Sequence, residues 1–204
     1  MPADSFRAVI DVVFPVAGQT LPRDHAQALQ RALCECLPWL SGDAGAGIHA
    51  IKLVSGNEAQ AMLPGRARLL VRVDESHVAD MVALAGRDLT IGNYALKLGM
   101  PSWKPLLRHG TLYAVKVAAN SADEVAFMAI IGQELSALGV GGETVCGKHQ
   151  HQMVDGVVLD TFSLMLHALS PEHSLRLQAH GLGSHRLMGC GIFVPHRSAA
   201  AVGA

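Results

Sequence analysis

Histidine is the side chain best suited to carry protons near neutral pH, and this chain has 11 of them. His25 stands out because it precedes a run of apolar residues at helical spacing. The pattern predicts a helix that carries His25 at its start, with the imidazole beside the core but not in it. Backbone amides at the start of a helix attract anions. His25 is therefore a candidate general acid or general base next to a bound anion, and a surface or capping histidine is the alternative.

Two further basic side chains could assist His25. His49 and Lys52 fall in a predicted strand over residues 48–54. A separation of three residues puts them on opposite faces of a strand, so only one can share a site with His25 unless the strand bends or ends there. His49 would act as a proton partner, and Lys52 would stabilise negative charge. Strand packing is the alternative role for His49, and a solvated side chain is the alternative for Lys52.

A row of arginines is predicted on the outer face of a strand over residues 66–73. Arg66, Arg68 and Arg72 alternate there with residues that face inward. Such a row suits a phosphate backbone, although a solvated sheet face would show the same pattern. Residues 47–116 contain nine basic and five acidic side chains, whereas the whole chain has a formal charge of −1. Any attraction to nucleic acid must therefore be local.

A glycine-rich stretch covers residues 181–191, with Gly-x-Gly pairs at 181/183 and 189/191. Glycine allows positive φ and a close approach of backbone to phosphate, so amides in this loop could hold an anion. Ser184, His185 and Arg186 lie between the two pairs, and we expect the loop to present them to a ligand. The stretch follows a predicted helix and leads into a last strand, which is not the position of a dinucleotide-binding fingerprint. An ordinary glycine-rich connection is the alternative.

Lys148, His149 and His151 lie near a predicted second hairpin and are candidates for phosphate contacts. His149 and His151 also match part of a metal site, but the sequence shows no evident third ligand. No cluster of paired carboxylates suggests a two-metal nuclease, and the four cysteines are expected to pack in the core. We therefore expect neither a metal nor a cofactor.

The order of predicted elements is β-α-β-β-α-β, and it occurs twice. This order is the ferredoxin-like pattern, so the fold class is α+β with two tandem ferredoxin-like domains at residues 1–100 and 110–197. Half of the residues are hydrophobic, enough to build a core in each domain. The sequence has no charged-then-apolar leader and no apolar run of roughly 20 residues, so we expect a cytoplasmic protein without a membrane partner.

Several short stretches, taken together in the order in which they occur along the chain, resemble the repeat-RNA processing endoribonucleases of CRISPR systems. The first stretch is Leu-Pro-Arg-Asp-His25, in the region where those nucleases carry a catalytic histidine. The glycine-rich loop resembles that of the repeat-associated RNA-binding (RAMP) superfamily. Further stretches resemble the myxobacterial subtype of the Cas-six family: Gly47-Ile-His49-Ala-Ile-Lys52, Arg66-Ala-Arg68-Leu, Thr111-Leu-Tyr113-Ala, Cys146-Gly-Lys148 and Phe193-Val-Pro-His196-Arg-Ser.

The resemblance implies two ferredoxin-like halves and a nuclease that needs no metal. It implies cleavage of CRISPR repeat RNA at the 3′ base of a hairpin stem, with 2′,3′-cyclic phosphate and 5′-hydroxyl ends. Subunits of a Cascade-type effector complex are the implied protein partners. Two other functions stay open from the sequence: a subunit that binds RNA hairpins without cutting them, and a ferredoxin-like protein that binds a small anion in its glycine-rich loop.

Overall fold

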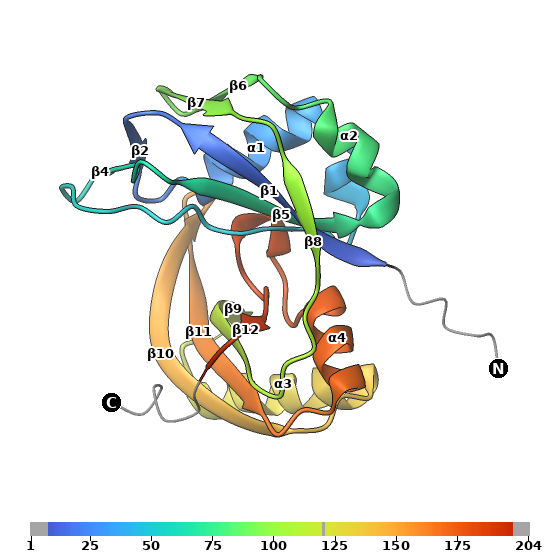
Figure 1. Cartoon of the computed structure of the whole chain (residues 1–204). Coiled ribbons are helices and arrows are strands. Elements are labelled where there is room, and N and C mark those ends of the chain that lie inside the picture. The colour runs from blue at the N-terminus through green and yellow to red at the C-terminus, as the bar shows by residue number, and fades with distance from the viewer. Residues whose placement is uncertain (1–7, 120, 198–204) are drawn as a thin grey trace. The chain divides into compact units, whose positions relative to one another are not determined.

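The structure is a computed structural model that describes residues 8–119 and 121–197 (Figure 1). The chain divides into two compact units between Leu106 and Leu107. Unit 1 contains α1 (Ala26–Cys36), α2 (Val78–Val82) and the strands β1 (Val9–Ala17), β2 (Thr20–Pro22), β3 (Gly47–Ile48), β4 (Gln60–Met62), β5 (Arg68–Asp74), β6 (Asp88–Ile91), β7 (Tyr94–Leu98) and β8 (Ser102–Pro105). Unit 2 contains α3 (Glu124–Leu138), α4 (Pro171–His180) and the strands β9 (Leu112–Ala119), β10 (Glu143–Val154), β11 (Val157–His167) and β12 (Val194–Pro195).

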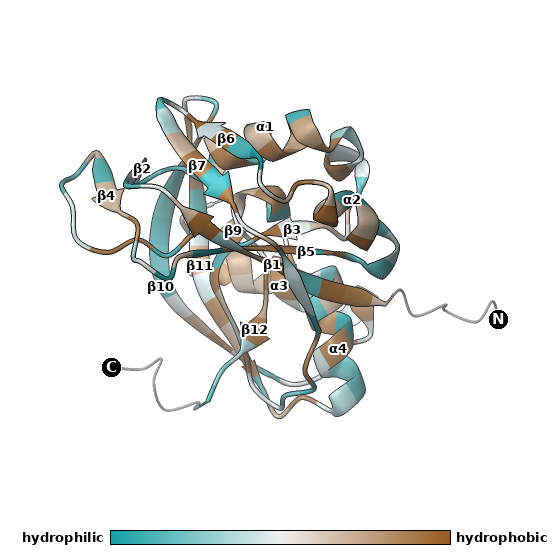
Figure 2. Cartoon of the chain, turned by 45° about the horizontal axis from the view of Figure 1, so that its top comes forward, coloured by the Kyte–Doolittle hydropathy of each residue, from teal (hydrophilic) through white to brown (hydrophobic). Residues whose placement is uncertain are grey.

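The main sheet of unit 1 has β1 at its centre. Its strand order is β3-β5-β1-β7-β6, with β8 also paired to β1, and the pairings are antiparallel. The helix α1 lies in the chain between β1 and β3, and α2 lies between β5 and β7. This arrangement is the ferredoxin-like fold that the order of elements predicts. The apolar residues of β1 explain why it is central, because strands with neighbours on both sides are the most buried (Figure 2).

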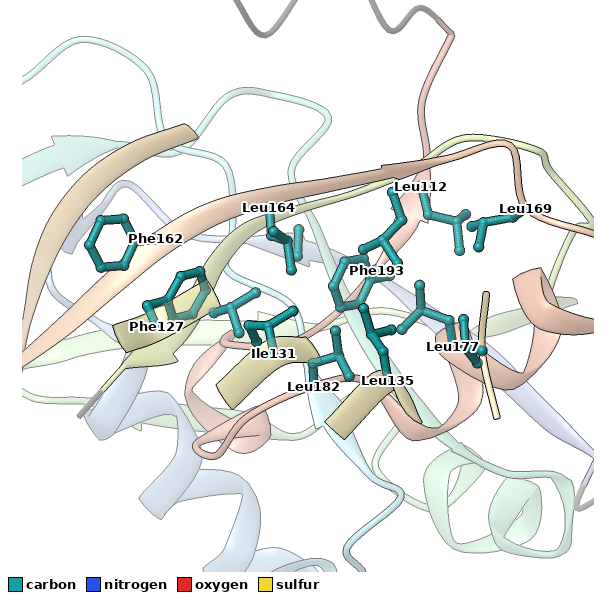
Figure 3. Close-up of a cluster of buried hydrophobic side chains, with 14 of the residues drawn as sticks. Leu112, Phe127, Ile131, Leu135, Phe162, Leu164, Leu169, Leu177, Leu182 and Phe193 are labelled. Carbon is teal, nitrogen blue, oxygen red and sulfur yellow. The ribbon is translucent and has the colours of Figure 1, made fainter. Parts of the chain in front are cut away.

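Unit 2 has the same arrangement of strands and helices. Its strand order is β10-β11-β9-β12, with α3 and α4 in the two crossover positions. The turn between β10 and β11 is Asp155-Gly156, as predicted, and both residues have positive φ. Gly139 ends α3 in the left-handed conformation, also as predicted. Phe127, Ile131 and Leu135 project from α3 into a core that Phe162, Leu164 and Phe193 close from the sheet side (Figure 3).

Four local predictions were wrong. The strand expected over residues 48–54 is only Gly47–Ile48, and the chain from 49 to 54 is irregular. The expected linker after residue 100 contains β8, which pairs with β1. Proline suits the first turn of a helix, so the sequence predicts Pro22 at the start of α1, but Pro22 ends β2. The spacing of Ser121 and Glu124 predicts a capping box with Ser121 as the cap of α3. Asp123 is the cap instead, and its carboxylate accepts the backbone N–H of Val125.

Candidate functional site

His25 occupies the N-cap position of α1, as the sequence predicted, but its side chain is buried. Only 5% of the residue is exposed, so the expectation that the ring lies outside the core was wrong. The carbonyl oxygen of Pro22 lies 3.0 Å from Nδ1, and the backbone N–H of Ile51 donates to Nε2 at 3.2 Å. A carbonyl can only accept and an amide can only donate, so the proton sits on Nδ1 and Nε2 carries the lone pair. His25 is thereby held in the neutral tautomer whose Nε2 lone pair accepts the backbone N–H of Ile51.

The same contact brings His25 to the residue next to Lys52. Ile51 is buried, whereas the neighbouring Lys52 is exposed. Residues 49–54 do not form a strand, so their side chains do not alternate between two faces. The prediction that His49 and Lys52 lie on opposite faces of a strand therefore does not apply. His25 therefore anchors the backbone of a segment that carries a solvent-exposed ammonium group.

His49 lies in a different environment, within a buried ion pair of unit 1. Asp11 on β1 is directly opposite Arg72 on β5, and the guanidinium makes two bonds to the carboxylate, Nε to Oδ1 at 2.8 Å and Nη2 to Oδ2 at 3.1 Å. The Nε2 atom of His49 is 3.6 Å from Asp11 Oδ1, which is too long for a hydrogen bond, and it is buried without a hydrogen-bond partner. The charged side chains of Asp11 and Arg72 and the buried imidazole of His49 thus form one small polar cluster.

The pKa values within this cluster follow from burial and charge. Burial is the largest effect on the pKa of His49 and lowers it. The Asp11 carboxylate raises this pKa, but burial and the charges on Arg72 and Lys104 together keep it below its ordinary value. The ring is therefore neutral at neutral pH. Burial alone would raise the pKa of Asp11, but His49 and Arg72 more than offset this effect, and the pKa lies below its ordinary value.

The predicted arginine row is only partly present. Arg66 and Arg68 are exposed at the start of β5, as predicted. Arg72 was expected to face outward with them, and this expectation is wrong because the side chain is fully buried against Asp11. A buried guanidinium that already makes two bonds to a carboxylate is a structural element of the sheet and not a free phosphate contact.

The glycine-rich loop is a compact turn whose amides are used internally. The Gly183 amide donates to the carboxylate of Glu134 at 2.7 Å, and the Gly191 amide donates to the Lys116 carbonyl at 2.8 Å. Any Cβ at Gly181 or Gly191 would collide with neighbouring atoms, and both glycines have positive φ. These two amides already have partners, so the anion cradle stays a prediction for the other amides of the loop.

Arg186 was expected to project from this loop, and that prediction is wrong. The residue is 8% exposed, and its guanidinium donates to the carbonyl oxygens of Gly191 and Ala179. Arg186 therefore ties the two ends of the loop together. Ser184 and His185 are exposed at its tip, as predicted, with Ser184 Oγ 2.7 Å from His185 Nδ1.

The predicted group on β10 is Lys148, His149 and His151, and its two histidines lie next to Asp160, a residue that was not predicted as a partner from the sequence. Lys148 is exposed, and His149 and His151 meet on one side of the strand with ring centroids 4.7 Å apart. Both imidazoles contact one oxygen of Asp160 on β11, His149 Nε2 at 2.7 Å and His151 Nδ1 at 3.1 Å. No third ligand was evident in the sequence beside the two histidines, and the structure places the Asp160 carboxylate next to both. Counting residues back from the Asp155-Gly156 turn places residue 160 opposite residue 151, a signal that was available in the sequence.

Among the described residues, no helix has the length and apolar character needed to span a membrane.

The described cysteines are all unpaired, and burial raises the pKa of Cys146 and of Cys190 to about 11 in each case. These thiols are therefore protonated at neutral pH and are poor nucleophiles.

Comparisons with known proteins agree on one family. The family model described as Cas6 Crispr matches residues 10–198. The chain is 38% identical over 194 residues to a CRISPR-associated endonuclease Cas6 of Myxococcus xanthus (strain DK1622), a match that covers 95% of this chain and 84% of that protein. A solved structure of a CRISPR associated protein Cas6 has a TM-score of 0.67 at 10% identity, covering 93% of this chain and 99% of the other. A structure of Thermus thermophilus Cse3, bound to an RNA that represents a pre-cleavage complex, has a TM-score of 0.51 at 13% identity and covers 91% and 98% of the two chains.

Proposed function

The chain belongs to the Cas6 family of CRISPR-associated endonucleases, and from this membership we propose that it processes CRISPR repeat RNA. The protein binds the hairpin of the repeat and cuts at the 3′ base of the stem without a metal ion. The products carry a 2′,3′-cyclic phosphate and a 5′-hydroxyl. The observation that carries this proposal is the contact between His25 Nε2 and the amide of Ile51, next to the exposed Lys52.

His25 is proposed as the general base. Nδ1–H donates to the Pro22 carbonyl, so Nε2 is the nitrogen that can accept a proton once the Ile51 amide has left it. RNA binding displaces the Ile51 amide, and the 2′-hydroxyl next to the scissile phosphate takes its place. Nε2 accepts the hydroxyl proton while the 2′-oxygen attacks phosphorus, and the 5′-oxygen leaves with a proton from solvent. The irregular backbone of residues 49–54 supports this exchange, because no strand pairing has to break for Ile51 to move.

Lys52 is proposed as the group that stabilises the phosphorane. Its ammonium group is exposed, and negative charge develops on the non-bridging oxygens in the transition state. His49 is the weaker candidate for the second group, because its Nε2 is buried beside Asp11 and Arg72. We therefore assign His49 to the buried cluster and Lys52 to the reaction.

The exposed residues among the predicted contacts are proposed to bind RNA. In unit 1 these are Arg66 and Arg68, whose guanidinium groups suit the phosphate backbone of a stem. In unit 2 they are the exposed Ser184, His185, Lys148 and His151, together with the half-buried His149. Subunits of a Cascade-type effector complex are the proposed protein partners, and the cytoplasm is the proposed location.

A cleavage assay in EDTA tests the function and the assigned residues together. Radiolabelled repeat hairpin is incubated with the wild-type protein and with the His25→Ala and Lys52→Ala variants. We expect metal-free cleavage by the wild type and a loss of about 100-fold or more in the single-turnover rate with His25→Ala. Lys97→Ala is the matched control, because Lys97 is an exposed lysine of β7 in the same unit. A Lys52→Ala variant that cuts as fast as Lys97→Ala would remove Lys52 from the reaction.

A hairpin-binding protein that does not cut is the second candidate function. It is favoured by one observation: the ring of His25 is buried, and both of its nitrogens are occupied by backbone groups. In that case His25 would only position the 49–54 segment. Tight hairpin binding without any cleavage in EDTA or in Mg²⁺ would establish this alternative. Parallel assays with a ribose and a 2′-deoxy sugar at the scissile position separate the two functions. The nuclease binds both substrates and cuts only the ribose substrate, whereas the non-cutting protein binds both and cuts neither.

A further inference from the structure

We propose that His149, His151 and Asp160 form a binding site for one divalent transition-metal ion of the zinc type. The potential ligand atoms of these three side chains all lie within 4.8 Å of one another. Two imidazoles and a carboxylate are a ligand set that Zn²⁺ accepts, and a fourth position is left for water.

The backbone around the site fixes the direction of the three side chains. A β-bulge shifts the register of β10 between Cys146 and His149, and this shift brings His149 to the side of the strand that carries Cys146. His151 lies two residues further along on the same side and directly opposite Asp160. The ligands therefore come from neighbouring strands of one hairpin and not from a mobile loop.

The histidine rings are also held in place by neighbours. The ring of His149 stacks on Phe162 with centroids 4.7 Å apart, and Phe162 stacks in turn on Phe127 in the core. The Asp160 side chain is 25% exposed and that of His151 is 64% exposed, so the site is open to ions from solvent. One ligand is thus anchored to the core, while another stays free to adjust.

The distances allow an ion to enter with small movements. At Zn–N and Zn–O bonds of about 2.0–2.2 Å, tetrahedral ligand atoms are about 3.4 Å apart. Asp160 Oδ1 now lies 2.7 Å from His149 Nε2 and 3.1 Å from His151 Nδ1. The ligand atoms all lie within 4.8 Å of one another, so shifts on the order of an ångström suffice. Zn²⁺ would bind His149 through Nε2 and His151 through Nδ1, and each imidazole would stay neutral with its proton on the other ring nitrogen.

This site is separate in its residues from the proposed cleavage chemistry. All three ligands belong to unit 2, whereas His25 and Lys52 belong to unit 1. A metal at this position is therefore compatible with cleavage in EDTA. Binding of the ion can be measured without RNA, so the inference stands or falls independently of the proposed function.

Calorimetric titration of the full chain with Zn²⁺, after removal of any affinity tag, tests the proposal. We expect one ion per chain, and a dissociation constant at least about tenfold weaker in His151→Ala and in Asp160→Asn. His180→Ala is the matched control, since it removes an exposed histidine of the same unit that lies outside the site. Wild-type protein that takes up no Zn²⁺ at micromolar concentration, or variants that bind as tightly as His180→Ala, would overturn the proposal.

Nitrogen NMR of the imidazole rings gives a second and independent readout. On addition of Zn²⁺, we expect the shifts of His149 Nε2 and His151 Nδ1 to change to values typical of metal-bound nitrogen. This measurement needs no variant, so it remains decisive if Asp160→Asn disturbs the hairpin. Binding through the opposite nitrogens, or through histidines elsewhere in the chain, would contradict the geometry described here.

Discussion

The buried pair of Asp11 and Arg72 gives the sharpest prediction about the scaffold of unit 1. We consider Asp11→Ala, which removes the carboxylate and leaves the guanidinium where it is. The Arg72 side chain is 1% exposed and loses both of its bonds to Asp11. Removing one partner of a buried pair typically costs about 3–5 kcal/mol, because the remaining charge is left uncompensated. We expect the free energy of unfolding of unit 1 to fall by about this amount.

The two tryptophans of the chain provide the assay. Trp39 and Trp103 both lie in unit 1, so tryptophan fluorescence during urea unfolding reports on that unit. Asp80→Ala is the matched control, because Asp80 pairs with His77 at an exposed position with 52% of its side chain accessible. Exposed pairs contribute about 0–1 kcal/mol, so the control should lose little stability.

A double variant distinguishes a lost ion pair from general damage to the sheet. Replacing Asp11 by Leu and Arg72 by Met together removes the buried guanidinium that Asp11→Ala leaves without its carboxylate. We expect this double variant to recover most of the free energy of unfolding that Asp11→Ala loses. If Asp11→Ala costs no more than Asp80→Ala, or if the double variant is no more stable than the single one, then the pair does not hold the sheet in the way argued here.

Three further predictions concern pH, salt and the glycine-rich loop. His49 is neutral when folded because its pKa is lowered, whereas the unfolded side chain takes up a proton below about pH 6.5. Stability should therefore fall as the pH drops below about 6.5, and His49→Gln should lose this part of the pH dependence in urea unfolding. Arg66→Ala combined with Arg68→Ala should weaken RNA binding and reduce the slope of log K against log salt by about 2, and an unchanged slope would mean that the two arginines are only solvated surface. Gly191→Ala should cost more than about 1 kcal/mol, since φ is +65° and the Cβ has no room, whereas Gly132→Ala, in open space on α3, should be neutral or stabilising by thermal unfolding.

The fold was predictable from the sequence because its signals are local. The Asp155-Gly156 turn, the Gly139 helix end and the apolar face of α3 are each set by a few neighbouring residues. Together they determine the order of elements, and the order determines the ferredoxin-like sheets. The errors lie where short elements depend on a distant partner, as with β8, which forms because β1 offers it an unpaired edge.

The candidate site was less predictable, and the arginines show why. A strand pattern places Arg72 on a face, but it does not reveal that Asp11, 61 residues away in the chain, lies directly opposite. Arg186 is buried for a comparable reason, because carbonyl oxygens at the two ends of its loop accept its hydrogen bonds. Sequence patterns identify a charge and its face, whereas its partner depends on register and on loop closure.

The difference between the buried, hydrogen-bonded arginines and the exposed Lys52 bears directly on the mechanism. Arg72 and Arg186 already have fixed partners, and a charge bound in that way cannot move to a phosphate without exposing a buried partner. Lys52 and the Ile51 amide belong to a segment without strand pairing, so they can change partners at much lower cost. An RNA substrate is therefore expected to reorganise residues 49–54 and to leave the arginine-bound parts of the scaffold unchanged. Amide exchange measured with and without a 2′-deoxy repeat hairpin would test this, and protection that changed around Arg72 but not around Ile51 would contradict it.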